Sequence, residues 1–147
     1  MPRLILFAAC EKLIVDQVNV LSLISLMQEI NIQIPADAVL PPEVKLAPMT
    51  WTILSIWEQE SGDQDKEFEQ RIAITLESGE IVTETPIVTF QMKTPQHRNI
   101  GMVVGIPIEP QSYYIRTWLK EKHSLEWGNE VGRYPLKVNR VIPAQVS

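Results

Sequence analysis

The strongest pair of reactive side chains in this sequence is His97-Arg98. A histidine can act as a general base, and an arginine can hold an anion, so the pair is a candidate catalytic site. The pair also stands between Pro95 and the apolar run 100–108, which suits the start of a strand. There the arginine would pair with a carboxylate on a neighbouring strand. We favour this structural interpretation.

The other candidates for a reactive or metal-binding site are weaker. Cys10, the single cysteine, could be a nucleophile beside a histidine, but its apolar run 7–10 is typical of a buried small hydrophobe. One cysteine and two histidines cannot assemble the usual zinc ligand sets. The stretch 63–65 resembles part of a calcium loop but lacks its glycine and its closing glutamate. We therefore expect no metal and no cofactor.

Aromatic side chains offer a binding surface instead of a reaction centre. In the run 113–119, alternation places Tyr114, Arg116 and Trp118 on one face. Tyrosine, tryptophan and arginine are enriched at the anchors of protein interfaces. Trp51 and Trp57 share a face with Ile53, so we expect these two tryptophans in the core.

The elements that must position these side chains are strands. Apolar residues recur at every second position, and β-branched and aromatic residues dominate the runs, as in 30–34, 51–57, 68–76 and 113–119. Glycine-containing turns separate several of them. This pattern predicts an all-β fold: one domain, residues 1–147, built as a two-sheet antiparallel β-sandwich.

Two segments need a separate interpretation. Residues 18–30 fit a helical stripe as well as a strand, and we favour the strand because clean alternation follows directly. Segment 35–48 contains four prolines, which a central strand disfavours, so we expect a crossover loop between the sheets.

The predicted core contains apolar residues from four of the runs. The apolar, uncharged run 100–108 is expected to be a central strand covered on both faces, since an exposed edge of this kind invites unwanted pairing. The predicted core residues are Ile53, Ile72, Ile74, Val103 and Ile115.

Composition limits the class of partner. The chain is 45% hydrophobic and 21% charged, which is typical of a globular domain. Its net charge of -5 opposes binding to nucleic acid and to anionic membranes. No apolar run approaches the roughly 20 residues that cross a bilayer. We expect a soluble protein and, in the absence of any targeting signal, a cytoplasmic one.

Several short motifs stand in a fixed order along the chain: Phe7-Ala8-Ala9-Cys10-Glu11, Asp16 with Ser22-Leu23-Ile24, Trp51 with Trp57, Phe68-Glu69-Gln70-Arg71, His97-Arg98-Asn99, Gly105-Ile106-Pro107 and the run 113–119. Together they resemble an uncharacterised bacterial family known only as a domain of unknown function. The resemblance implies a β-sandwich and supplies no activity.

Three functions follow as hypotheses. The leading one is a non-enzymatic module that binds a partner protein or a second copy of itself, forming a homo-oligomer. The alternative is a small-molecule or carbohydrate-binding module that uses the Tyr114 and Trp118 face. The third is an enzyme that uses His97 and Arg98. An exposed aromatic face would favour binding, whereas a concave pocket around His97 would favour an enzyme.

Overall fold

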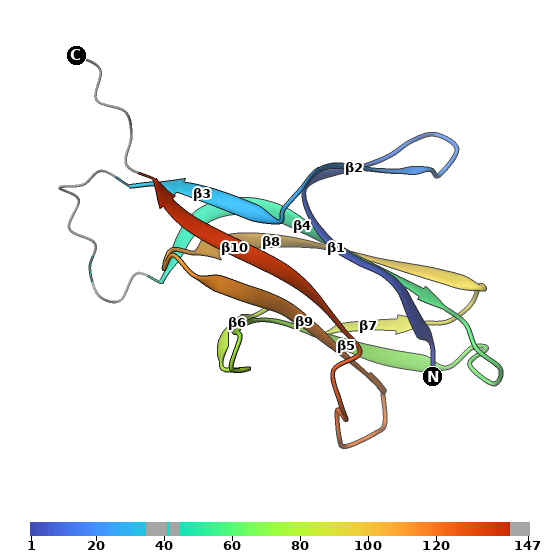
Figure 1. The fold of residues 1–147 in the computed structure, drawn as a ribbon. Helices are drawn as coiled ribbons and strands as arrows, with labels where there is room; N and C mark the ends of the chain where they lie inside the picture. The colour runs from blue at the N-terminus through green and yellow to red at the C-terminus, as the bar shows by residue number, and fades with distance from the viewer. Residues whose placement is uncertain (35–40, 42–44, 142–147) are drawn as a thin grey trace, which may run out of the picture.

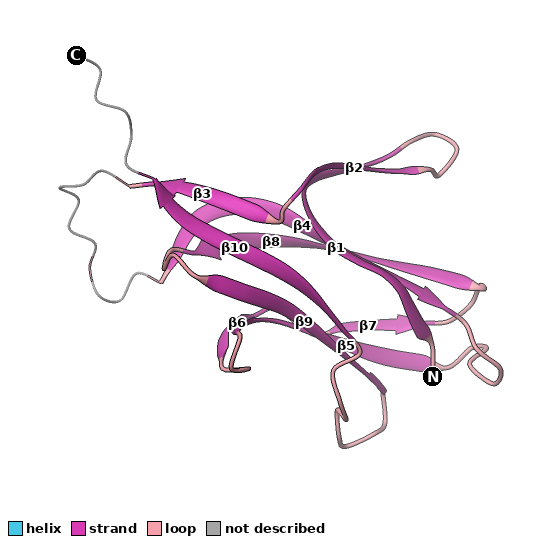
Figure 2. Ribbon diagram, in the orientation of Figure 1, coloured by secondary structure: helices cyan, strands magenta, loops and turns pink. Residues whose placement is uncertain are grey.

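The chain folds as two packed β-sheets (Figure 1). The computed structural model describes residues 1–34, 41 and 45–141. Over these residues the secondary structure consists of strands and loops, without helix (Figure 2). The pairing of the strands is antiparallel except between β3 and β10. The predicted all-β, two-sheet sandwich is confirmed.

Sheet A has the strand order β2–β1–β4–β8. Sheet B has the order β3–β10–β9–β5–β6, and β7 pairs with β5 beside β6. The strands of sheet A are β1 (Arg3–Val15), β2 (Leu21–Leu26), β4 (Leu46–Glu58) and β8 (Gln96–Pro107). Those of sheet B are β3 (Glu29–Gln33), β5 (Glu67–Leu76), β6 (Ile81–Glu84), β7 (Val88–Gln91), β9 (Ser112–Glu121) and β10 (Gly132–Val141).

The ambiguous segment 18–30 forms strands, as predicted. It contains β2 and the start of β3, and Met27 between them is buried. The Met27 N–H donates to the Ala9 carbonyl at 2.9 Å, which fixes the point where the chain leaves sheet A for sheet B. Segment 35–48 also joins the two sheets, since β3 lies in sheet B and β4 in sheet A. Most of it lies outside the described residues, and Pro48 belongs to β4.

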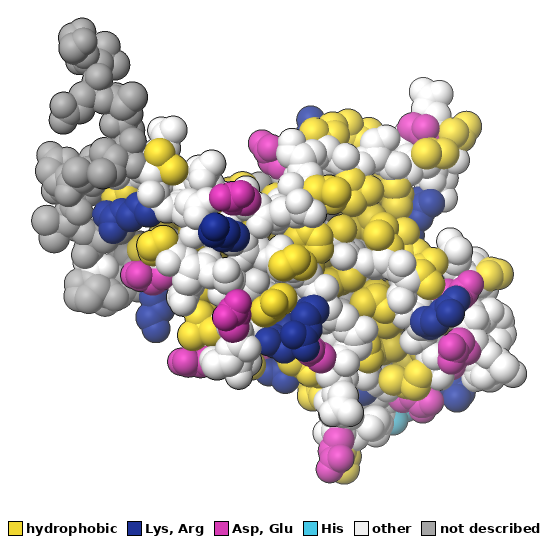
Figure 3. Space-filling view, viewed as in Figure 1, with side chains coloured by type: hydrophobic (Ala, Val, Ile, Leu, Met, Phe, Trp, Pro, Cys, Tyr) yellow, Lys and Arg dark blue, Asp and Glu magenta, His cyan; other side chains and the backbone are white. Residues whose placement is uncertain are grey.

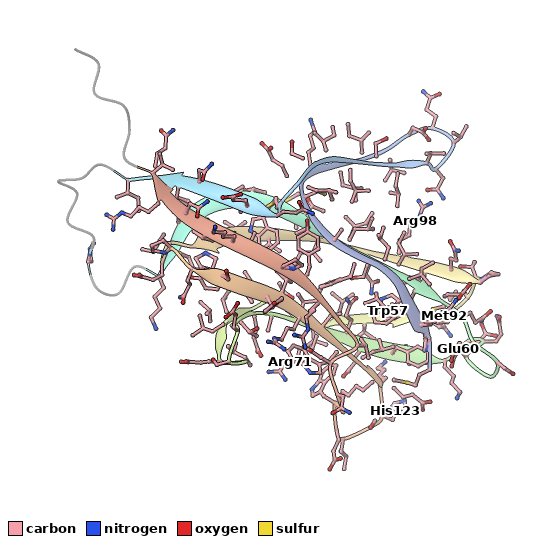
Figure 4. The ribbon with its side chains drawn as sticks, in the orientation of Figure 1. Trp57, Glu60, Arg71, Met92, Arg98 and His123 are labelled. Atoms are coloured by element: carbon pink, nitrogen blue, oxygen red, sulfur yellow. The ribbon has the colours of Figure 1, made fainter. Side chains whose placement is uncertain are left out.

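The hairpin of β1 and β2 turns back toward the start of β8. Strand β1 pairs with β4 up to Cys10, and from there to Val15 it pairs only with β2. The Asp16 carboxylate accepts the N–H groups of Val18 and Val20, each at 2.9 Å, and closes the hairpin tip. The Arg98 guanidinium reaches this tip and donates to the Asn19 carbonyl at 3.0 Å (Figure 4).

The core lies between the inward faces of the two sheets. Trp51 and Trp57 are fully buried, as predicted from the face that they share with Ile53. Ile53, Ile72, Ile74 and Ile115 are also buried, as predicted. Val103 is half-buried and packs against the edge of the core, so its predicted burial is only partly correct.

The prediction that the run 100–108 forms a central strand is wrong. Most of this run is β8, which is the last strand of sheet A and pairs with β4 alone among the described residues. Its outward side chains are open to solvent: Met102 is 77% exposed, Val104 71% and Ile100 47%. An apolar sequence therefore occupies an edge, where natural proteins usually place charge, proline or a bulge.

Among the described residues, no helix is long and apolar enough to span a membrane.

Candidate binding site

Tyr114, Arg116 and Trp118 lie together on the outward face of β9, as alternation predicts, and each is half-buried. Arg71, which pairs with Trp118 in the register of β5 and β9, places its guanidinium 5.0 Å from the centre of the indole ring. The Tyr114 ring lies between Arg116 and Arg133, at 5.3 and 5.2 Å. Cation–π contacts of this kind cover the aromatic faces with side chains of the same chain.

The arginines of this face are also paired with carboxylates. Arg116 donates to Glu130 at 2.9 Å, and Arg133 contacts the other oxygen of Glu130. Burial alone would raise the pKa of Glu130, but the hydrogen bonds from Arg116 and Arg133 lower it below its ordinary value. Arg71 is paired with Glu84. The arginines on the outer face of sheet B are thus paired with carboxylates of the same chain.

The loop after β9 contributes to the same cover. Lys120 forms an ion pair with Glu69 at 3.1 Å, and its ammonium group lies 4.9 Å from the centre of the Trp127 ring. This is the arrangement expected if the segment 123–129 folds over the β9 face within one chain. A ligand that binds this face would have to displace these contacts.

His97 and Arg98 point to opposite faces of sheet A. The His97 ring stacks on Phe90, with the ring centres 4.7 Å apart, and it bonds the Asn99 side chain at 2.9 Å. Arg98 points outward to the hairpin tip at Asn19. The partner of Arg98 is therefore an amide and a backbone carbonyl, where the sequence suggested a carboxylate. The two side chains do not form one base-and-anion site, and neither meets the β9 residues.

A buried polar network that sequence reasoning missed lies between the sheets. The Gln70 amide donates to Ser55 at 2.7 Å and to Thr117 at 3.0 Å. Its carbonyl oxygen accepts from Asn99 at 2.7 Å and from Trp57 at 3.3 Å. All four hydrogen-bonding positions of this amide are in use, so Gln70 ties the two sheets together. The sequence signal for this network was Gln70 itself, a polar residue at an inward position of a strand whose apolar residues alternate with period two.

Over the described residues, β8 carries apolar side chains that are exposed to solvent. No charged side chain lies between Asn99 and Ile108. Near its end, Gly105 has φ +109 and a Cβ there would approach Leu46 to 3.3 Å, so only glycine suits this bend. The Gly105 carbonyl accepts from the Trp51 indole at 2.8 Å, which holds the edge on the core.

Two hollows open between β8 and the strand edge of sheet B. The larger, about 210 Å³, is lined by Ile53, Gln70, Ile72, Thr85, Pro86, Val88, Asn99, Gly101, Met102 and Val103. The smaller, about 130 Å³, is lined by Trp51, Ile74, Thr83, Glu84, Thr85, Pro86, Met102, Val103, Val104 and Gly105. They share four residues and together form a groove, which we call the edge groove, along β8. Its lining is mainly apolar.

Two further side chains with groups that could react, Cys10 and Tyr134, are buried. Burial raises the pKa of the Cys10 thiol, which keeps the thiol protonated and unreactive. Burial is also the main reason why the pKa of Tyr134 is raised. Over residues 1–34, 41 and 45–141, no three His, Cys, Asp or Glu side chains gather in a way that could hold a metal ion.

No protein-family model matches the chain, and no curated protein is significantly similar to it. The resemblance to an uncharacterised bacterial family therefore stays a prediction.

Proposed function

We propose that the chain is a non-enzymatic protein-binding module that takes up an extended segment of a partner polypeptide as an additional strand along β8. The observation that carries the proposal is a strand edge that no other described strand pairs with and that has no charged side chain from Asn99 to Ile108; Met102 and Val104 on it are mostly exposed, and an open apolar groove lies beside it. Strand addition gives affinity through main-chain hydrogen bonds and specificity through pockets for alternate side chains.

The contacts around the other candidates support this choice. The aromatic rings of Tyr114 and Trp118 are already engaged by Arg71, Arg116 and Arg133, which leaves less of their faces for a sugar or a peptide. His97 lies flat on Phe90 and faces away from Arg98, an arrangement that suits packing better than proton transfer. These observations favour the binding module over the carbohydrate site and the enzyme.

A site-specific crosslinking experiment tests the proposal. A photo-crosslinking amino acid is placed at Met102 or Val104, and as a matched control at Tyr114 or Trp118, in cells that naturally make the protein. We expect the β8 positions, but not the β9 positions, to capture one recurring polypeptide, identified by mass spectrometry. Capture from β9 alone, or from neither face, would contradict the proposal.

A further inference from the structure

The two hollows of the edge groove repeat along three strands at once. From the larger hollow to the smaller, the lining residue on β4 changes from Ile53 to Trp51, and on β5 the lining changes from Gln70 and Ile72 to Ile74. On β8, Gly101 lines the larger hollow and Gly105 the smaller, with Val103 shared. The step on β4 and β5 is two residues.

Two residues of a strand span about 6.6 Å, and side chains at positions i and i+2 point to the same face. A strand added alongside β8 would continue sheet A and direct every second side chain inward, toward sheet B. The hollows therefore have the spacing of two successive inward side chains of such a strand.

The volumes fit large side chains. A cavity of about 150 Å³ accommodates a benzene ring. The hollows, at about 130 and 210 Å³, are thus large enough for leucine, isoleucine or phenylalanine. Alanine, serine or glycine would leave them mostly empty.

A second copy of this chain fits the groove poorly. If its β8 paired antiparallel with β8, with the outward faces aligned, the side chains that it would direct inward are those of Gly101 and Val103, which pair with the inward Ile53 and Trp51. A glycine and a valine cannot fill the two hollows. A self-pairing of this kind would leave the voids in place and lose their dispersion contacts.

The charge of the groove selects an uncharged segment. Among the described residues, Glu84 is the one charged residue that lines the two hollows, and it is paired with Arg71. A charged side chain pointing inward would have no partner there and would lose its hydration. Two copies of the chain would each also bring a net charge of -5.

On the basis of the proposed function, we infer that the partner supplies an uncharged, extended segment with large apolar side chains at positions i and i+2, which fill the two hollows. The main chain of the segment pairs with β8. The two side chains decide which segments bind.

Two peptides test this inference. One is a capped nonapeptide of threonine with lysine at both ends and leucine at its fourth and sixth positions; the other has alanine at those positions. Binding of the fluorescently labelled peptides is measured by anisotropy at physiological salt. We expect the alanine peptide to bind at least about 50-fold more weakly, because six carbon atoms are lost and burial of only about half of their surface would account for that factor.

A variant that fills one hollow is the matched control. Gly101 has an ordinary φ, and a Cβ built there meets nothing closer than the Ile53 carbonyl at 4.0 Å, so Gly101→Val can be accommodated and directs its side chain into the larger hollow. We expect it to weaken the leucine peptide about tenfold and to leave the alanine peptide unchanged. Thermal unfolding confirms that the variant is folded.

N-methylation separates strand addition from filling of the hollows. Methyl groups on alternate peptide nitrogens of the leucine peptide block one edge of its backbone, and we expect one of the two alternate patterns to abolish binding. If methylation abolishes binding but the leucine and alanine peptides bind equally, the inference is wrong and the proposed function stands. If neither peptide binds up to about 1 mM, strand addition itself is refuted. A concentration-dependent dimer in sedimentation that Met102→Lys dissociates would identify a second copy as the occupant and overturn the inference.

Discussion

The outer face of sheet B and the free edge of sheet A treat large side chains in opposite ways. On sheet B, Trp118 and Tyr114 lie under arginines, and the arginines are paired with carboxylates. On β8, Met102 and Val104 lie open to solvent. Hydrophobic side chains are also exposed over β1 and the β1–β2 hairpin (Figure 3). Residue type alone therefore does not mark a binding surface. The aromatic rings on sheet B are in contact with arginines of the same chain, whereas the aliphatic side chains of β8 are exposed to solvent.

The largest expected effect concerns Gln70, which is buried between the sheets and lines the larger hollow. Replacing it with leucine leaves the polar groups of Ser55, Thr117, Asn99 and Trp57 without this partner between the sheets. We expect Gln70→Leu to cost about 3 to 5 kcal/mol of unfolding free energy. Urea denaturation followed by tryptophan fluorescence measures it. The exposed Gln64→Leu is the control and should unfold like the wild type.

The second largest effect on stability is expected at Trp118, whose ring lies beneath Arg71. Trp118→Ala removes a half-buried indole and its cation–π contact, and we expect a loss of about 2 kcal/mol because full burial would make it 3 to 5. Trp118→Phe, which retains an aromatic face for Arg71, should recover much of the loss. Peptide binding at β8 should not change in either variant. A folded Trp118→Ala protein with wild-type stability that has lost its partner would make the β9 face the interface.

Replacing Glu130, the carboxylate that Arg116 and Arg133 share, should have a somewhat smaller effect on stability. Glu130→Gln removes the charge between Arg116 and Arg133, and we expect a loss of about 1 to 2 kcal/mol, since the pair is only partly buried. Chemical denaturation at neutral pH provides the measurement. Glu126→Gln, an exposed position nearby, serves as the control. Equal stability of the two variants would show that the arginines are held by other contacts.

The same carboxylate gives stability a pH dependence of known sign. The pKa of Glu130 in the folded chain lies below its ordinary value of 4.5. Its contribution is therefore complete above the unfolded pKa and is lost as the pH falls through the folded pKa. We expect the stability difference between wild type and Glu130→Gln to be constant well above pH 4.5 and to shrink as the pH falls below 4.5. A difference that stays constant as the pH falls would contradict the assignment.

The smallest effect on stability is expected at the edge. Met102 is 77% exposed, so Met102→Thr should change the unfolding free energy by less than about 0.5 kcal/mol. The same substitution should reduce light scattering of concentrated solutions, because it removes an apolar group from an open strand edge. If Met102→Thr were as destabilising as Trp118→Ala, the two regions would not differ in the way described.

The sequence predicted the sandwich because alternation reports which side chains share a face. It placed Ile53, Ile72, Ile74 and Ile115 correctly, and it assigned β2 and β3 despite a competing helical stripe. Alternation carries no information on the order of strands in a sheet, so the central position of β8 was predicted only from its apolar, uncharged sequence. The expectation that edges are protected failed at this strand.

The candidate site was predictable in part. Tyr114, Arg116 and Trp118 share a face as expected, but their cover comes from Arg71, Arg133 and Glu130, which are distant in sequence or follow a loop. The edge groove is formed by β4, β5, β8 and residues from the end of β6 to the start of β7. A hollow between such strands has no local pattern, so it appears only when the strands are assembled.

The pairing of β3 with β10 has a consequence for how the chain is made. Asn31 and Asn139, whose side chains bond across this parallel pair, are 108 positions apart. At ribosomal rates of about 5 to 20 residues per second, β3 waits roughly 5 to 20 s for its partner to be synthesised. During that time Ile30 and Ile32, which pack on the finished core, have no β10 beside them. Sheet B therefore cannot close before β10 has been synthesised, and until then the nascent chain carries an aliphatic strand, β3, without its neighbour.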